Sequence, residues 1–101
     1  MKQLERIAYM EQILDDATEA VAVLETALER YCAMQEKLQE LSAYYTGSQW
    51  LQDFDDDSAG KLPADLKRGV LSEDAVYNLL TDNDRLRETL LDAVHRIPEQ
   101  E

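Results

Sequence analysis

The chain has 101 residues, a formal net charge of −12, 45% hydrophobic residues and a single cysteine. That length predicts one domain, residues 1–101, and the hydrophobic content excludes a disordered acidic tail. The negative charge disfavours nucleic acid and anionic membranes as partners and favours solubility, basic partners or metal cations.

Two further features concern the compartment. No apolar run approaches the roughly 20 residues that span a bilayer, and charges interrupt the opening "MKQLERIAYMEQ". We therefore expect neither a membrane segment nor an export signal. Cys32 has no second cysteine to pair with, so the expected compartment is the cytoplasm.

Residues 1–46 contain no glycine or proline and carry apolar residues in a seven-residue repeat. The first seam position holds Ile7, Leu14, Val21, Leu28, Gln35 and Ser42. The second holds Met10, Ala17, Leu24, Tyr31, Leu38 and Tyr45, and a flanking stripe holds Ile13, Ala20, Ala27, Met34 and Leu41. This pattern predicts one long helix that ends at Gly47, a typical glycine after a helix C-terminus.

The next part, which we call the connecting segment (residues 50–74), begins within a short predicted helix capped by Ser48. Trp50 and Phe54 are four residues apart and therefore share a face of that helix. The segment then loops and turns at Gly60, Pro63 and Gly69.

A second long helix is predicted from Ser72, a good N-cap, to about Ile97, just before Pro98. Its seam consists of Val76, Leu79, Asn83, Leu86, Leu90, Ala93 and Ile97, supported by Leu80 and Val94. Asn83 is the polar member. It either fixes the register of the packing or points to solvent, and both interpretations remain open.

The two long helices differ in length, at roughly 65 Å and about 37 Å. The second helix should cover the first from about Val21 to Tyr45. The apolar residues left uncovered are Ile7, Met10, Ile13 and Leu14. A second copy of the chain, a different protein, or a break near residues 16–18 could cover them, and we favour a homodimer. The predicted fold is therefore an all-α long helical hairpin that completes a helical bundle by dimerisation.

The aspartates of the connecting segment are a candidate metal site. Asp53, Asp55 and Asp57 have the alternating spacing that opens an EF-hand loop. The rest of that motif fails, because Ser58 stands where glycine is expected and Ala64 where glutamate is expected. A looser Mg²⁺ or Ca²⁺ site remains as a hypothesis.

Internal pairing is the interpretation that we favour for this cluster. Negative charge near a helix C-terminus is unfavourable, and cations could offset it. The cations closest in sequence are Lys61, Lys67 and Arg68.

The remaining candidates for chemistry are weak. An anion site at "LKRGVLSED" is opposed by Glu73 and Asp74, and acidic residues four apart along the helices are typical of solvated faces. Cys32 and His95 lie on different predicted helices with no evident partner. We predict no catalytic residue and no cofactor.

The chain has three distinctive stretches. They are "RIAYMEQ" at the start, "YY" at 44–45 and "WLQDFDDDSAGKLPADLKRGVLSEDAVYNLL" from Trp50. Over nearly its whole length it resembles a bacterial family, domain of unknown function 4298. The most specific positions are Trp50, Asp53, Phe54, Asp57, Gly60, Leu62, Pro63 and the run from Asp65 to Asp74. The resemblance implies a small helical protein and carries over no activity, cofactor or catalytic residue.

The function that these observations favour is a non-enzymatic protein-interaction or structural module, because an ordered loop on a rigid scaffold is where binding usually occurs. A homodimer is the expected assembly, and a further partner would be a protein with a basic or apolar surface. The candidate interaction surface consists of Trp50, Asp53, Phe54, Asp57, Lys67 and Arg68. The alternative is a divalent-metal-dependent hydrolase of a small phosphorylated molecule.

Overall fold

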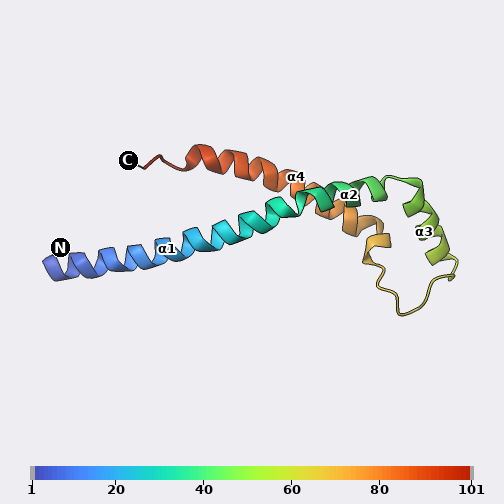
Figure 1. Ribbon diagram of the computed structural model, residues 1–101, viewed down its shortest axis with the longest axis horizontal. Coiled ribbons are helices and arrows are strands. Elements are labelled where there is room, and N and C mark those ends of the chain that lie inside the picture. The colour runs from blue at the N-terminus through green and yellow to red at the C-terminus, as the bar shows by residue number, and fades with distance from the viewer. Residues whose placement is uncertain (1, 101) are drawn as a thin grey trace. The chain divides into compact units, whose positions relative to one another are not determined.

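The computed structural model describes residues 2–100 and divides between Glu36 and Lys37 into two compact units. The elements in order are α1 (Gln3–Ala33), α2 (Gln35–Tyr45), α3 (Ser48–Ser58), the short 3-10 helix η1 (Gly69–Leu71) and α4 (Glu73–Arg96) (Figure 1). No strand occurs between residues 2 and 100. The predicted all-α class is confirmed; the hairpin packing, the single domain and dimerisation stay predictions.

The unit Met1–Glu36 is built around α1, a helix of 31 residues. Glu5 lies in its first turn and Arg30 in its last, where each charge suits the helix dipole. The helix runs through residues 16–18 without interruption, so the break considered there is wrong (Figure 1). No residue of α1 is buried.

The predicted single helix over residues 1–46 needs one correction, because a turn at Met34 separates α1 from α2. The Met34 amide donates to the carbonyls of Arg30, at 3.0 Å, and Tyr31, at 3.2 Å. The second of these bonds is the tighter 3-10 type, which often forms where an α-helix ends. The heptad pattern does not register such a local change of hydrogen bonding.

Gly47 ends α2 as predicted, although not in the left-handed conformation typical of a C-terminal glycine. Its φ of −103° is extended, and it is itself the N-cap of α3. Glycine suits the close approach of the backbone here, since a Cβ would lie 3.1 Å from the Ala43 carbonyl oxygen, a tight contact. Ser48, expected as the N-cap, is instead the first residue of the helix.

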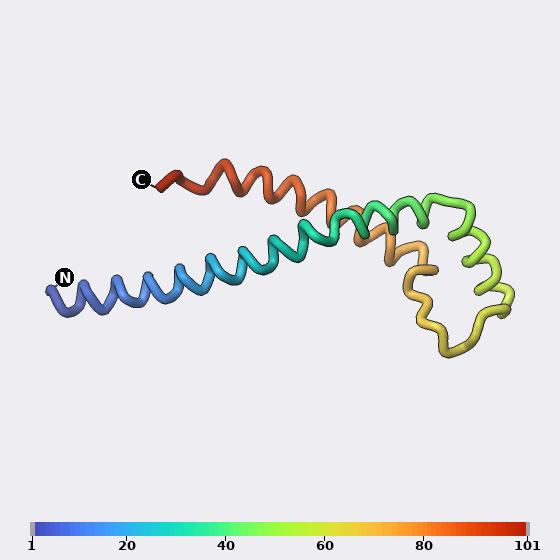
Figure 2. Tube along the Cα trace, viewed as in Figure 1, coloured from blue at the N-terminus to red at the C-terminus, as the bar shows by residue number. Residues whose placement is uncertain are grey.

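The unit Lys37–Glu101 has a small core in which Trp50 of α3, Leu71 of η1 and Val76 of α4 are buried. The Trp50 indole stacks on Phe54 with 5.1 Å between ring centroids and meets Tyr45 edge-on at 5.2 Å. The indole N–H donates to the Val70 carbonyl at 2.9 Å. One side chain therefore joins α3 to the turn that precedes α4, where the chain returns from its loop (Figure 2).

α4 begins and ends where predicted. The Ser72 hydroxyl accepts from the Ala75 amide at 3.3 Å, and Ile97 follows the last helical residue. The predicted seam is covered in part. Val76 is buried, and Asn83, Leu90, Ala93 and the supporting Leu80 are half-buried, whereas Leu79, Leu86 and Ile97 are exposed. Asn83 is thus neither fully buried nor fully in solvent.

Candidate functional site in the connecting segment

The end of α3 is a hydrogen-bonded turn that centres on Gly60. Gly60 has a φ of 73°, a conformation that favours glycine. Its amide donates to the Asp57 carbonyl and the Lys61 amide to the Asp56 carbonyl, each at 3.0 Å. This is the Schellman arrangement, which satisfies carbonyls that the helix end leaves open. The loop therefore leaves α3 in a defined direction.

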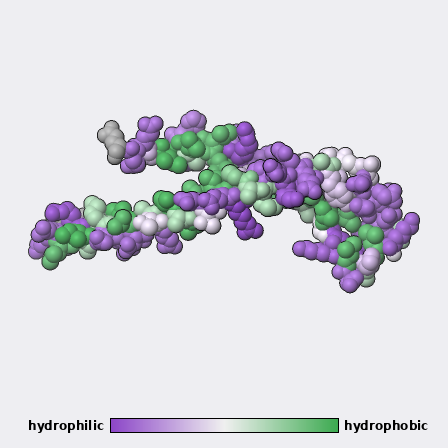
Figure 3. All heavy atoms as spheres, viewed as in Figure 1, coloured by the Kyte–Doolittle hydropathy of each residue, from purple (hydrophilic) through white to green (hydrophobic). Residues whose placement is uncertain are grey.

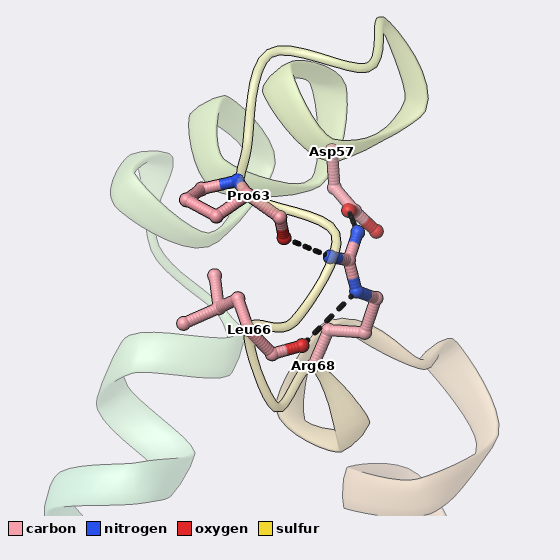
Figure 4. Close-up of polar contacts among 4 residues, drawn as sticks. All are labelled: Asp57, Pro63, Leu66 and Arg68. Atoms are coloured by element: carbon pink, nitrogen blue, oxygen red, sulfur yellow. Dashed lines mark hydrogen bonds and ion pairs between the residues drawn. The ribbon is translucent and has the colours of Figure 1, made fainter.

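Arg68 holds the part of the loop that follows Pro63 against the end of α3 (Figure 4). Its guanidinium pairs with the Asp57 carboxylate, donates to the Pro63 carbonyl at 2.5 Å, and donates through Nε to the Leu66 carbonyl at 3.3 Å. A planar guanidinium can serve several acceptors at once, which a lysine ammonium does with less geometric definition. Arg68 thereby ties residues 63–68 to the end of α3.

The internal pairing expected for the aspartates is confirmed for two cations and wrong for the third. Lys61 lies 3.9 Å from Asp56, and Arg68 pairs with Asp57. Lys67 is exposed and makes no ion pair with any residue in 2–100. Neighbouring residues in a loop point in different directions, and the cation spacing did not distinguish Lys67 from Arg68.

Asp53 has a different partner, which the sequence did not suggest. The Tyr44 hydroxyl donates to Asp53 Oδ2 at 2.6 Å. This hydrogen bond, with desolvation and the carboxylate charge, raises the pKa of Tyr44 to about 12. The neighbouring Tyr45 hydroxyl donates to the Glu73 carbonyl at 3.0 Å, at the start of α4. The "YY" pair thus joins the end of α2 to both ends of the connecting segment.

Little of the aspartate cluster is arranged for a metal. Asp53 and Asp57 accept from Tyr44 and Arg68, and Asp55 is exposed. Within the described part of the chain, no three His, Cys, Asp or Glu side chains are placed to hold a metal ion. The metal-site hypothesis for Asp53, Asp55 and Asp57 stays a prediction without geometric support.

The surface of this region has one concave patch that the sequence did not reveal. It lies beside the Trp50 anchor, where Leu51 is 58% exposed. Its lining residues are Tyr45, Thr46, Gly47, Trp50, Leu51 and Glu73. Of the predicted interaction surface, Trp50 is buried, Asp53, Phe54, Asp57 and Arg68 are half-buried, and Lys67 is exposed. Most of these residues hold the connecting segment together, and Lys67 is the one whose side chain is exposed.

The predicted dimer seam lies on α1, and its side chains are exposed. Ile7, Met10, Ile13 and Leu14 are between 44% and 58% exposed. Hydrophobic side chains are spread along the visible face of α1 between hydrophilic ones (Figure 3).

Two further residues considered for chemistry are both accessible. Cys32 is a free, exposed thiol, and His95 is exposed on α4. Between residues 2 and 100, no helix has the length and apolar character to cross a membrane.

Comparison with known proteins agrees with the resemblance read from the sequence. Neither the curated proteins nor the solved structures include a significant match to this chain. Residues 7–93 match the model of one family, and that range includes α2, α3, η1, the connecting segment and most of α1 and α4. The chain belongs to the family described as Domain of unknown function (DUF4298).

Proposed function

We propose that the chain is a non-enzymatic protein-interaction module that forms a homodimer through α1. One observation carries the proposal: α1 has 31 residues, and none of them is buried. Its apolar residues follow a heptad repeat, the pattern by which helices pair in coiled coils. Apolar surface that recurs along one helix is costly to leave in water and is typical of an interaction site.

The connecting segment supports the proposal from the other unit. Asp53, Asp57 and Arg68 are occupied in holding the loop, and Trp50 is occupied in anchoring it. We propose that this ordered surface binds a protein with a basic or apolar surface, with Lys67, Leu51 and the concave patch as its accessible parts. The proposal includes a cytoplasmic location, which the free thiol of Cys32 supports.

The solution mass of the full chain over a wide concentration range tests the homodimer. We expect the mass of two chains, and Leu14→Lys should shift the equilibrium toward monomer. Tyr9→Lys is the matched control, because Tyr9 is about equally exposed, at 54% against 58% for Leu14, but lies off the seam. A monomer at all concentrations would contradict the homodimer.

Thermal unfolding with and without Mg²⁺, Mn²⁺ or Ca²⁺ tests the absence of a metal-dependent activity. We expect no ion-specific stabilisation. A stabilisation abolished by Asp53→Asn or Asp57→Asn would instead favour the hydrolase alternative.

A further inference from the structure

The charged residues of α1 are arranged unevenly around its apolar seam. We define the α1 seam as Ile7, Met10, Leu14, Ala17, Val21, Leu24 and Leu28. α1 carries nine charged residues, and only Arg6, Glu11 and Glu25 occupy the positions that flank this seam. The other six lie on the outer positions of the helix: Glu5, Asp15, Asp16, Glu19, Glu29 and Arg30. Most of the negative charge of α1 is therefore turned away from whatever covers the seam.

The surface beside the seam is shaped to receive side chains. A shallow depression lies on one side of it. It is lined by Leu14, Ala17, Thr18, Val21, Ala22 and Glu25. Helix pairs pack by inserting side chains into such depressions between small residues.

We infer that the α1 seam is covered by α1 of a second copy that runs parallel to it and in register. This inference rests on the proposed homodimer and adds its orientation. In a parallel pair, a residue just before the first seam position faces the residue five places later in the other helix. Arg6 therefore faces Glu11 of the partner subunit, and the symmetry of the dimer makes this contact twice.

The two charges are available for that contact. Among the described residues, neither the Arg6 nor the Glu11 side chain makes an ion pair or a hydrogen bond. The other flanking contacts of the parallel pair join Ile13 to the partner's Thr18, Ala20 to the partner's Glu25 and Ala27 to the partner's Cys32. No like charges meet beside the seam.

The antiparallel arrangement with full overlap is less favourable. It places Glu11 opposite the partner's Glu25, again twice, and leaves Arg6 opposite an apolar residue. Sliding one helix by a heptad removes the repulsion but uncovers a full turn or more of the seam. A partner with basic flanks would pair with Glu11 and Glu25 but would place a like charge beside Arg6, which the parallel pairing of two copies avoids.

Distances between spin labels distinguish the orientations. Labels are attached to Glu5→Cys or Glu19→Cys in the full chain with Cys32→Ser, both on the outer face. In a parallel dimer the two labels at position 5 lie at the same level along the dimer axis, so only the width of the helix pair separates them. In the fully overlapped antiparallel dimer they are about 42 Å apart along the axis. We expect the short distance at position 5.

Position 19 is the control, because it lies at the centre of the overlap and gives a short distance in both orientations. A short distance at 19 with a long one at 5 would overturn the parallel orientation and leave the homodimer intact. No dipolar signal at either position, with a monomer mass, would overturn the homodimer and the inference together.

Charge reversal tests the contact itself. Arg6→Glu should raise the dimer Kd about tenfold, because two attractive pairs become repulsive. The double variant Arg6→Glu with Glu11→Arg should restore the Kd to within about threefold. Arg30→Glu changes the net charge equally from an outer position and should have little effect. If Arg30→Glu weakens the dimer as much as Arg6→Glu, or the double variant gives no recovery, the Arg6–Glu11 contact is wrong.

Discussion

In the unit Met1–Glu36, α1 buries none of its residues, whereas in the unit Lys37–Glu101 the side chains of Trp50, Leu71 and Val76 form a small core. α1 owes its regularity to composition, since it lacks helix-breaking residues along its length. The second unit depends on individual contacts: one indole, one guanidinium and two tyrosine hydroxyls.

The difference bears on the proposed interaction module. Isolated helices are marginally stable in water, and most of their stability in proteins comes from packing an apolar face. α1 is therefore expected to gain stability from a partner. The second unit has its own core and can keep the connecting segment ordered.

The largest expected effect is that of Trp50→Ala, which tests whether the second unit depends on a single anchor. Loss of the buried indole should destabilise this unit by about 3–5 kcal/mol, because a cavity opens and the hydrogen bond to Val70 is lost. Urea unfolding followed by near-ultraviolet circular dichroism would measure it. Leu51→Ala, at an exposed position of the same helix, is the control; an equally small change in both variants would contradict the anchor role.

Arg68→Ala should lower the free energy of unfolding by about 2 kcal/mol, because Asp57 loses its partner and two loop carbonyls lose a donor. The side chains are only half-buried, which limits the effect. In double-mutant cycles measured by urea unfolding, Asp57 should couple to Arg68. The cycle of Asp57 with Lys67 should be additive, and coupling there would contradict the assignment.

The Tyr44–Asp53 bond predicts a loss of stability at alkaline pH. The pKa of Tyr44 is raised from 10.0 to about 12, so its stabilisation is fully present below pH 10 and is lost as the pH rises toward 12. Tyr44→Phe should cost about 1 kcal/mol at neutral pH and should lose less stability between pH 10 and 12 than the parent. Urea unfolding across this range would measure both. Equal alkaline sensitivity in the variant would assign the loss to other groups.

Gly60→Ala should have a similarly small effect, about 1 kcal/mol, because alanine is strained at the φ of 73° that closes the helix end. No atom lies within 4 Å of the added Cβ, so backbone strain alone should act. Gly69→Ala is matched, because its Cβ also meets open space and its φ is not positive. Thermal unfolding should show a lower midpoint for Gly60→Ala alone, and equal midpoints would contradict the strain.

Much of the architecture could be predicted because it depends on local pattern. The absence of glycine and proline before Gly47 indicated helix, and Ser72 and Pro98 marked the ends of α4. The turn at Met34 could not be predicted, because no residue type there requires it. The exposure of Leu79 beside the half-buried Leu80 could not be predicted either, because neighbouring apolar residues satisfy the pattern equally well.

The internal contacts of the connecting segment could be predicted only in part. The aromatic pair and the cluster of charges located the connecting segment, and opposite charges in one loop indicated internal pairing. The sequence could not show that Arg68 rather than Lys67 pairs with Asp57, or that Tyr44 is the partner of Asp53. Both depend on the directions of the side chains. The "YY" pair was visible, yet nothing in its spacing identified an acceptor nine residues away for Tyr44.

The sequence alone determined the helical class, the ends of α4, the heptad seam of α1 and the membership of a family, because propensity, capping and periodicity act over a few residues. Tertiary structure decided which carboxylate each cation and tyrosine meets, how Trp50 joins α3 to η1, and which face of α4 is covered. Three of these contacts join residues that are 9, 11 and 20 positions apart, and their geometry follows from how the backbone turns between them.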